Sequence, residues 1–431
     1  MEVHARTATA RGIANRAWRA KEVGGGADMS LKEDIAKHKA SLPLRYTREW
    51  LQERFREFYA RAEPELPPRF TTREWGMFGW GDKLMQRHLA FRSEDGLQTR
   101  LAREAPMHVY HSVAYYAHPS AGKMNEKQWQ AADLIFDLDA DHLPEMELLK
   151  QGKITFGKLI EIIRGQTVRL VEDFLMGDLG IAIENLQMVF SGGRGYHVHV
   201  RAPVVLGLPS GARRELADYL TGLGADVERL LHDAGHTRKF KGKHRTTGEL
   251  RLPSTDAPGW QGRVARFASA WLTETQALPA KEQLARLKSL PGIGSTMAKR
   301  AQLDGTPQGV FDALPRRVQT ALRDAALIEC AVHADEPVTG DLHRLIRLPG
   351  TLHGGTGLLA QSMTLEELRT FDPYRQATAL GEAPVKVRCV AGHPVAMGDV
   401  ASLKPDEVTE MPASQGAYFM ARGFATLEIE T

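Results

Sequence analysis

Cysteine is almost absent from the chain, which holds only Cys330 and Cys389 in 431 residues. Two distant cysteines exclude both a disulfide-stapled fold and a zinc knuckle built on a Cys-x-x-Cys pair. Long apolar runs are missing as well, since no stretch reaches the roughly 18 apolar residues of a membrane helix. The first 28 residues carry Arg and Lys but no apolar segment, so they are not a secretory signal. We therefore expect a cytoplasmic protein without a membrane partner.

A strong charge of either sign is also lacking. Lys and Arg number 56 against 53 Asp and Glu, which gives a formal net charge of +3. This balance permits nucleic acid binding without requiring it, so any basic binding surface would have to be local. Hydrophobic residues make up 42% and charged residues 25% of the sequence, which is the profile of a globular protein with a full core.

The order of helix-like and strand-like segments predicts an α/β fold of the mixed α+β kind. Strand-like patterns dominate 73–118 and return at 327–339, on either side of a helical stretch from 260 to 326. Strands before and after a helical block indicate one core whose sheet is completed late. The predicted parts are a basic leader (1–28), the first part of the core (29–205), a mainly helical subdomain (206–326) and the completion of the core (327–431).

The stretch LIFDLDAD, residues 134–141, runs from large apolar side chains into carboxylates at alternate positions. Strand side chains alternate between two faces, so Asp137, Asp139 and Asp141 are predicted to share one face. Carboxylates held roughly 6–7 Å apart suit divalent cations that bridge them to a phosphate. A strand end with solvated acids explains the same pattern, so this stretch alone leaves both interpretations open.

A glycine-rich turn stands between two strand-like segments in VFSGGRGYHVHV. Ser191, Gly192 and Arg194 form a plausible phosphate cradle, since exposed N–H groups and a guanidinium both favour oxyanions. His197 follows on the next strand and shares a face with His199. A hairpin turn with a hydrogen-bonded histidine fits the pattern as well, whereas a zinc site would lack a nearby cysteine.

A third stretch, HADEPVTGDLHRLIRLPGTLHGGTG, ends in a glycine-rich loop. Asp335 offers another carboxylate, and Arg347 and His353 offer groups that bind anions after a short strand. In isolation, an edge strand followed by a turn explains this stretch equally well. Together, however, the three stretches supply what templated nucleotidyl transfer needs. Metals activate a 3′-hydroxyl and neutralise a triphosphate, while Arg and His stabilise charge on the phosphates.

These stretches resemble the motifs of the catalytic small subunit of archaeal and eukaryotic DNA primases. The family's DxD, SGxRGxH and paired Asp and His motifs fall on Asp137 and Asp139, on Ser191, Gly192, Arg194, Gly195 and His197, and on Asp335 and His353. The upstream segments TTREWGMF and HSVAYYAHP also look like the family's. The resemblance runs from about residue 40 to the C-terminus, and three ordered motifs make it highly specific.

The resemblance implies a catalytic core with a mixed β-sheet flanked by helices, and an added helical subdomain. It implies that Asp137, Asp139 and Asp335 are catalytic and hold Mg²⁺ or Mn²⁺. The nucleotide-binding residues that it implies are Ser191, Gly192, Arg194, His197, Arg347 and His353. The implied reaction is the synthesis of short RNA primers on single-stranded DNA from NTPs, with dNTPs as further substrates. The implied partner is the DNA primase large subunit, which carries an iron–sulfur cluster, in a heterodimer.

Two departures from the family's pattern affect these expectations. Many relatives carry a Cys/His zinc knuckle near the core, but residues 142–188 hold no cysteine, so zinc is not expected. Archaeal members often read LHGKTG where this chain reads LHGGTG. Gly355 thus stands in place of a lysine that is expected to contact the triphosphate.

Two further segments leave their role open. HTRKFKGKHR, residues 236–245, holds five Lys or Arg and no acid, which fits either a template backbone contact or a solvated basic loop. LPGIGSTMAKR, residues 290–300, resembles the hairpin of a helix-hairpin-helix DNA binder. A plain turn between two helices is the simpler interpretation of that segment.

Three other functions compete with that of a replicative primase. They are a stand-alone primase-polymerase of the same superfamily in repair, a metal-dependent phosphohydrolase, and a nucleic acid-binding module without catalysis. The last would not need three converging carboxylates. A priming assay separates the hydrolase, which makes no templated oligomer, and a co-purifying large subunit separates the two primase functions.

Overall fold

The computed structural model describes residues 42–143, 146–151, 153–233, 236–240, 243–247 and 250–429. These fall into two compact units, and the chain passes from one to the other several times. The smaller unit comprises residues 173–179 and 218–332, and the larger unit holds the other described residues. The predicted leader, 1–28, lies outside the described residues. Within them, no helix is long and apolar enough to cross a membrane.

Two four-stranded sheets dominate the larger unit, with the strand orders β14-β7-β8-β6 and β13-β3-β1-β2. Their strands are β6 (Leu134–Asp139), β7 (Leu186–Phe190), β8 (Gly195–Val200), β14 (Gln361–Met363), β1 (Trp75–Phe78), β2 (Gln86–Leu89), β3 (His108–Ser112) and β13 (Leu345–Arg347). Every strand pair in the described part of the chain is antiparallel. The predicted α+β class is confirmed, with antiparallel sheets where a mixed sheet was expected.

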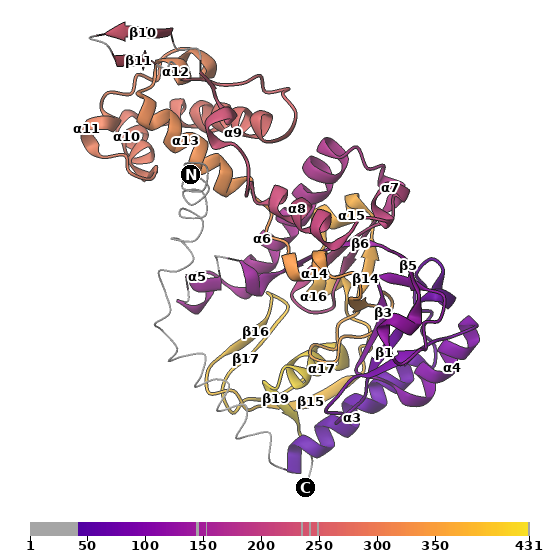
Figure 1. The fold of residues 1–431 in the computed structure, drawn as a ribbon. Coiled ribbons are helices and arrows are strands. Elements are labelled where there is room, and N and C mark those ends of the chain that lie inside the picture. Colours follow the sequence, from indigo (N-terminus) through magenta and orange to yellow (C-terminus); the bar gives the residue numbers. More distant parts are fainter. Residues whose placement is uncertain are drawn as a thin grey trace. The chain divides into compact units, whose positions relative to one another are not determined.

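Smaller sheets and helices surround these strands in the larger unit. The further strands are β4 (Ala114–Tyr116), β5 (Trp129–Ala132), β15 (Pro384–Cys389), β16 (Val395–Met397), β17 (Ala401–Leu403), β18 (Val408–Pro412) and β19 (Ala425–Leu427). The helices are α3 (Leu42–Tyr59), α4 (Glu94–Glu104), α5 (Met146–Lys150), α6 (Phe156–Arg169), α7 (Pro203–Leu206), α8 (Ser210–Leu220), α14 (Glu336–Gly340), α15 (Leu365–Thr370), α16 (Pro373–Gln376) and α17 (Ala413–Ala421). Helix α3 lies beside α4 and contacts both α17 and β19 (Figure 1).

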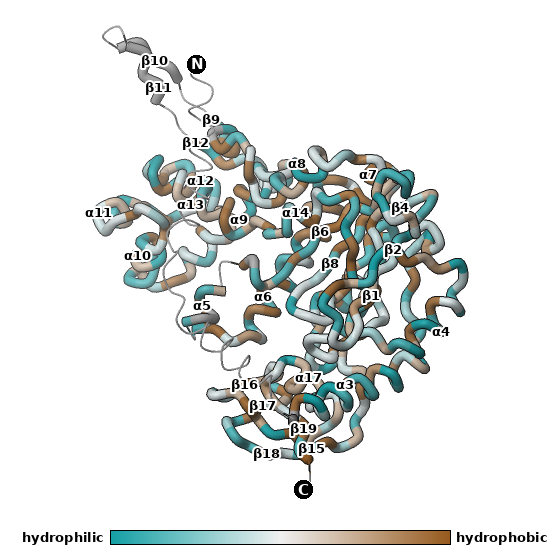
Figure 2. The backbone as a smooth tube through the Cα atoms, turned by 60° about the horizontal axis from the view of Figure 1, so that its bottom comes forward, coloured by the Kyte–Doolittle hydropathy of each residue, from teal (hydrophilic) through white to brown (hydrophobic). Residues whose placement is uncertain are grey.

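The sheet that holds β6 and β8 forms the most deeply buried part of the larger unit. All six residues of β8 are buried, and so are Leu134, Ile135, Phe136 and Leu138 of β6. Figure 2 shows hydrophobic residues along these two strands, whereas the surface helix α4 is largely hydrophilic. A strand with apolar residues on both faces is stable only when both faces are covered. The two aspartates of β6 therefore stand out as its partly exposed positions.

Two strand predictions are wrong. Residues 94–104, predicted as strand-like, form α4, because Ser93 caps the helix by accepting a hydrogen bond of 3.2 Å from the Gly96 N–H. Leu97 and Leu101 supply its buried face. Residues 327–339 form no strand: they comprise the end of α13, the connection 330–335 and most of α14. Pro337 in the first turn of α14 suits a helix start and would interrupt a strand ladder.

The smaller unit is mainly helical. Its helices are α9 (Gly259–Gln276), α10 (Ala280–Ser289), α11 (Ser295–Ala298), α12 (Pro307–Ala313) and α13 (Arg316–Glu329). Helix α9 packs against α12 and α13, with Leu272 and Phe311 fully buried. Arg263 of α9 lies 3.7 Å from the ring centre of Phe174 and forms an ion pair of 2.6 Å with Asp178. The main segment of this unit, 218–332, begins and ends later than the predicted limits 206 and 326. The unit also includes the separate segment 173–179.

Two segments of uncertain role lie in the smaller unit. The basic stretch 236–245 falls in the antiparallel hairpin of β10 (His236–Phe240) and β11 (Lys243–Thr247), with 241–242 outside the described residues. The short strands β9 (His232–Asp233) and β12 (Leu250–Arg251) pair beside it in sequence. Residues 290–294 form a turn between α10 and α11. Contacts of either segment with a template remain predictions.

At Gly195, β8 lies close against the backbone of β6. A Cβ atom on Gly195 would lie 2.1 Å from the carbonyl oxygen of Leu138 and 2.9 Å from the Cα of Asp139. Both are backbone atoms of β6, which cannot move aside as a flexible side chain would. Glycine is therefore required here for close contact, and not for an unusual backbone angle.

We predict that Gly195→Ala lowers the free energy of unfolding by about 1–3 kcal/mol or more, because the added methyl group forces β8 away from β6. Denaturant titration measures the change. Gly211→Ala is the matched control, since Gly211 lies on α8 with no atom within 4 Å of its added Cβ. It should be neutral or stabilising by about 0.4–1 kcal/mol. Equal stability of both variants would contradict the assigned contact.

Candidate active site

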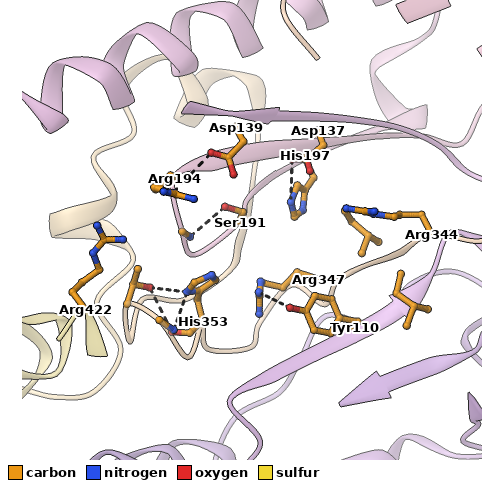
Figure 3. A pocket seen from close by; sticks show the side chains of 15 residues that line it. Tyr110, Asp137, Asp139, Ser191, Arg194, His197, Arg344, Arg347, His353 and Arg422 are labelled. Carbon is orange, nitrogen blue, oxygen red and sulfur yellow. Dashed lines mark hydrogen bonds and ion pairs between the residues drawn. The ribbon is translucent and has the colours of Figure 1, made fainter. Parts of the chain in front are cut away.

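Asp137 and Asp139 lie on one face of β6, as strand alternation predicts. Pairing with β8 sets Asp137 opposite His197 and Asp139 opposite Gly195. Their side chains keep 20% and 34% of their surface exposed. Both line a pocket of about 330 Å³ in the larger unit (Figure 3). The two carboxylates thus form an acidic wall that is open to a ligand.

Asp141 does not continue this face, so that prediction is wrong. Strand β6 ends at Asp139, whose carboxylate accepts a hydrogen bond of 3.0 Å from the Asp141 N–H and caps the 3₁₀ helix Ala140–His142. Asp141 instead forms an ion pair with the Arg194 guanidinium. The Nε atom of Arg194 also lies 4.0 Å from Oδ1 of Asp139. Arg194 is therefore held at the edge of the acidic wall.

Ser191 shapes the turn between β7 and β8. Its Oγ accepts hydrogen bonds from the N–H groups of Gly193 (3.2 Å) and Gly195 (3.3 Å). Both bonds use the oxygen as an acceptor, so the hydroxyl proton remains available to a ligand. Gly192 has a φ of +76°, and a Cβ there would lie 2.7 Å from the Cβ of His353. This glycine is needed both for its backbone angle and for contact with the neighbouring loop.

His197 is a buried, neutral histidine beside the acidic wall. Its Nε2 lies 3.5 Å from Oδ1 of Asp137. Burial, followed by the charges of Arg347 and Arg344, lowers the pKa of His197 to about 3. The contact with Asp137 is therefore no ion pair at neutral pH.

His353 projects from the loop after β13 with a defined tautomer. Its Nδ1 accepts a hydrogen bond of 3.2 Å from the Gly355 N–H, while the Thr356 hydroxyl donates its proton to the Gly192 carbonyl. This network assigns the imidazole proton to Nε2. Burial, followed by the charges of Arg347 and His108, lowers the pKa of His353 well below its usual value. A neutral N–H donor therefore stands in the pocket.

Arg347 is a buried cation whose partners are neutral. Its Nη1 lies 2.8 Å from Nδ1 of His108, and its Nη2 donates to the hydroxyl of Tyr110 over 3.0 Å. Only 6% of its surface is exposed, and burial lowers its pKa. In the described part of the chain it has no carboxylate partner. Because a buried charge is costly when it stays unpaired, Arg347 is suited to an anionic ligand.

Comparison with known proteins places this site in a family. A family model described as DNA primase small subunit matches residues 136–365, more than half of the chain. The DNA primase small subunit PriS of Methanothrix thermoacetophila is 39% identical over 394 residues, which cover 88% of this chain and 98% of the relative. The protein of the same name from Methanococcoides burtonii is 38% identical over 395 residues, with the same shares.

The chain belongs to the DNA primase small subunit family. This confirms the resemblance found in its motifs, and it makes the chain the catalytic subunit of a DNA primase, an enzyme that makes primers. The chain spans nearly the full length of these relatives. The family match covers both aspartates of β6, the turn after β7 and the loop that holds His353.

The primase pocket brings together most of the residues singled out from sequence. Those that line it are Asp137, Asp139, Ser191, Arg194, His197, Arg347 and His353. Gly192 is not among the lining residues, but its carbonyl group accepts a hydrogen bond from the hydroxyl of Thr356, which lines the pocket. Sequence reasoning missed Tyr110, Arg344, Thr356 and Arg422, which also line the pocket. Tyr110 directly precedes the noted upstream segment HSVAYYAHP, but nothing local marked its side chain or that of Arg422 as part of the site.

Asp335 contacts the primase site through a backbone hydrogen bond. Its N–H donates a hydrogen bond of 2.8 Å to the carbonyl of Asp137, and it stands at the start of α14. Its side chain is half-buried and is not among those that line the pocket. Within the described residues, no three His, Cys, Asp or Glu side chains come together as a ready metal site. The role of Asp335 as a metal ligand remains a prediction.

The neutral histidines of this primase subunit predict a loss of stability in acid. Five of them have lowered pKa values, namely His108, His111, His197, His199 and His353. Below pH 6.5 the unfolded chain binds protons at these side chains and the folded chain does not. The free energy of unfolding should therefore fall as pH drops from about 6.5 to 5, by up to about 1.4 kcal/mol per pH unit and histidine.

Denaturant titrations at several pH values measure this slope. His197→Gln removes one buried histidine and should make the slope shallower, whereas His393→Gln, at an exposed histidine, should keep the wild-type slope. If stability were constant between pH 6.5 and 5, these histidines would not be neutral in the folded protein.

Proposed function

We propose that this primase subunit synthesises short RNA primers on single-stranded DNA by joining nucleotides at the pocket beside β6. The proposal rests on one observation: negative side chains lie on one side of the pocket and a positive side chain lies on the other. Asp137 and Asp139 form one wall, and Arg347, buried and with no carboxylate partner among the described residues, stands across from them (Figure 3). A nucleoside triphosphate with bound metal needs both kinds of wall, because its phosphates are anionic and its metal is cationic.

The donor set of the acidic wall fits Mg²⁺ or Mn²⁺. Both cations prefer oxygen ligands, and Mg²⁺ is commonly held by one or two carboxylates together with substrate phosphates. Asp137 and Asp139 provide such carboxylates. The proposed third ligand is the carboxylate of Asp335, whose backbone N–H is hydrogen-bonded to the carbonyl of Asp137. A fully formed protein site is therefore not required before the nucleotide arrives. When bound, the metal activates the attacking 3′-hydroxyl and neutralises charge on the triphosphate.

The remaining residues bind and orient the phosphates without supplying covalent chemistry. His353 donates from Nε2, Ser191 donates its hydroxyl proton, and Arg347 provides the buried charge. Arg194 offers a further guanidinium, positioned by its ion pair with Asp141. His197 lies beside Asp137 and stays neutral. It can therefore help to position that carboxylate without forming an ion pair with it.

The proposed partners follow from the subunit's place in its family. We propose a heterodimer with the primase large subunit, acting in the cytoplasm on a single-stranded DNA template. Zinc is not part of the proposal, since Cys330 and Cys389 lie far apart in the sequence and the described residues hold no group of three suitable ligands. Elemental analysis of the purified protein tests this, with well below one zinc per chain expected.

A priming assay tests the proposed reaction. The protein is incubated with single-stranded DNA, Mn²⁺ or Mg²⁺, and either NTPs or dNTPs, and the products are resolved by length. Template-dependent oligomers from NTPs are expected. Release of phosphate without oligomers would instead indicate a phosphohydrolase, and activity on dNTPs alone would indicate a DNA-synthesising repair enzyme.

We predict that Asp137→Asn, Asp139→Asn and Asp335→Asn each reduce nucleotide incorporation by more than about 100-fold. Loss of a residue that merely supports a metal ligand costs only roughly 10–100-fold. The melting temperature should be nearly unchanged, because no apolar contact is lost. Asp399→Asn is the control, since Asp399 is an exposed acid in a surface pair with Arg375. A variant with all three changes that still made primers would end the proposed role of these aspartates as metal ligands.

A further inference from the structure

Arg422 is a pocket residue that lies outside the family match. It follows α17 directly, near the C-terminus, and lines the pocket together with His353 and Gly355. Figure 3 places its guanidinium at the end of the pocket near Arg194 and His353, away from Asp137 and Arg344. Arg422 thus lies at the end of the pocket that is remote from Asp137, past His353.

The Arg422 side chain is held in place but has no counter-ion among the residues that the structure describes. Its guanidinium lies 5.9 Å from the ring centre of Phe156 and 5.5 Å from that of Phe424. The Nε atom is buried without a hydrogen-bond partner, and no carboxylate pairs with the group in the described part of the chain. Arg388, in the same C-terminal region, instead pairs with Glu428 at 2.6 Å. A fixed cation with an unmet donor in a pocket is suited to an anion.

The neighbouring loop supplies no cation of its own. Gly355 lines the pocket without a side chain, and a Cβ there would lie 3.1 Å from the His353 ring. His353 is neutral, as its hydrogen bonds and lowered pKa indicate, and the charge of Arg422 contributes to that lowering after burial, Arg347 and His108. Arg422 therefore adds a positive charge at this end of the pocket, where the other guanidinium, that of Arg194, is already paired with Asp141.

We infer that Arg422 binds the terminal phosphate of the incoming nucleotide and thereby selects triphosphates over diphosphates. This inference rests on the proposed function, in which the reacting phosphate lies at Asp137 and Asp139. A triphosphate that extends from these carboxylates past His353 brings its last phosphate to Arg422. A diphosphate bound in the same way ends before that point.

The test is a binding measurement on the full chain without template, so that nothing polymerises. A fluorescent ATP analogue is displaced by ATP or by ADP in the presence of Mn²⁺, for the wild type and for Arg422→Gln, Arg422→Met and Arg422→Lys. Both neutral variants should weaken ATP binding by about tenfold or more and ADP binding by less than about threefold. Arg422→Lys keeps the charge and should retain part of the preference for ATP.

Controls separate a phosphate contact from a structural role. Arg388→Gln removes the same charge from the same region and should leave both affinities unchanged. Melting temperatures show whether the packing on Phe156 and Phe424 survives, and Met retains the aliphatic contact if Gln does not. The inference is overturned if ATP and ADP binding weaken equally, if neither changes, or if only binding to single-stranded DNA is lost. Failure of the wild type to bind ATP or make primers would instead overturn the proposed function.

Discussion

The close contact of β8 with β6 at Gly195 is the constraint on which the rest of the site depends. It leaves no room for a side chain between the strands, and it sets Asp139 opposite Gly195 and Asp137 opposite His197. A shift of register by one residue would turn both carboxylates to the opposite face. The turn that begins at Ser191 is closed by the Gly195 backbone, and its Gly192 carbonyl in turn receives the Thr356 hydroxyl. The acidic strand, the turn and the His353 loop thus form one connected arrangement.

The electrostatics of the site follow from burial. Histidines that lie beside arginines in a dry interior stay neutral, because burial and the nearby positive charge both oppose protonation. The pocket's positive charge is therefore carried by guanidinium groups, which keep it at any physiological pH. His197 and His353 can then act as short, rigid hydrogen-bond donors, while the attraction for phosphate comes from residues such as Arg347. This separation keeps the charge pattern of the pocket constant over a wide pH range.

The parts of the site that could be predicted from sequence are those encoded locally. Alternation along β6 is enough to place Asp137 and Asp139 on one face, and a glycine-rich turn between strands is visible in the sequence. Asp141 was misplaced because a side-chain cap, which alternation does not describe, ends the strand at Asp139. Tyr110 and Arg422 were missed because each enters the pocket from a distant element whose local pattern reads as ordinary strand or helix. Helix α4 was predicted as strand-like because the segments on either side of it have strand-like patterns, and the hydrogen bond from the Gly96 N–H to Ser93 that caps this helix does not appear in such patterns.

The sequence positions of the pocket residues constrain when the site can form during synthesis. The pocket takes side chains from Tyr110 through Arg422, and the two large sheets are completed only by β13 and β14, which pair with β3 and β7. The whole of segment 218–332 is synthesised after β3 and β7 and before their partners β13 and β14. Contacts so distant in sequence form late and slowly. In a nascent chain, the acidic strand β6 is therefore made long before Arg347, the buried arginine across the pocket from it. A chain that stops a few residues short of Arg422 lacks the cation at one end of the pocket as well as the last strand, β19.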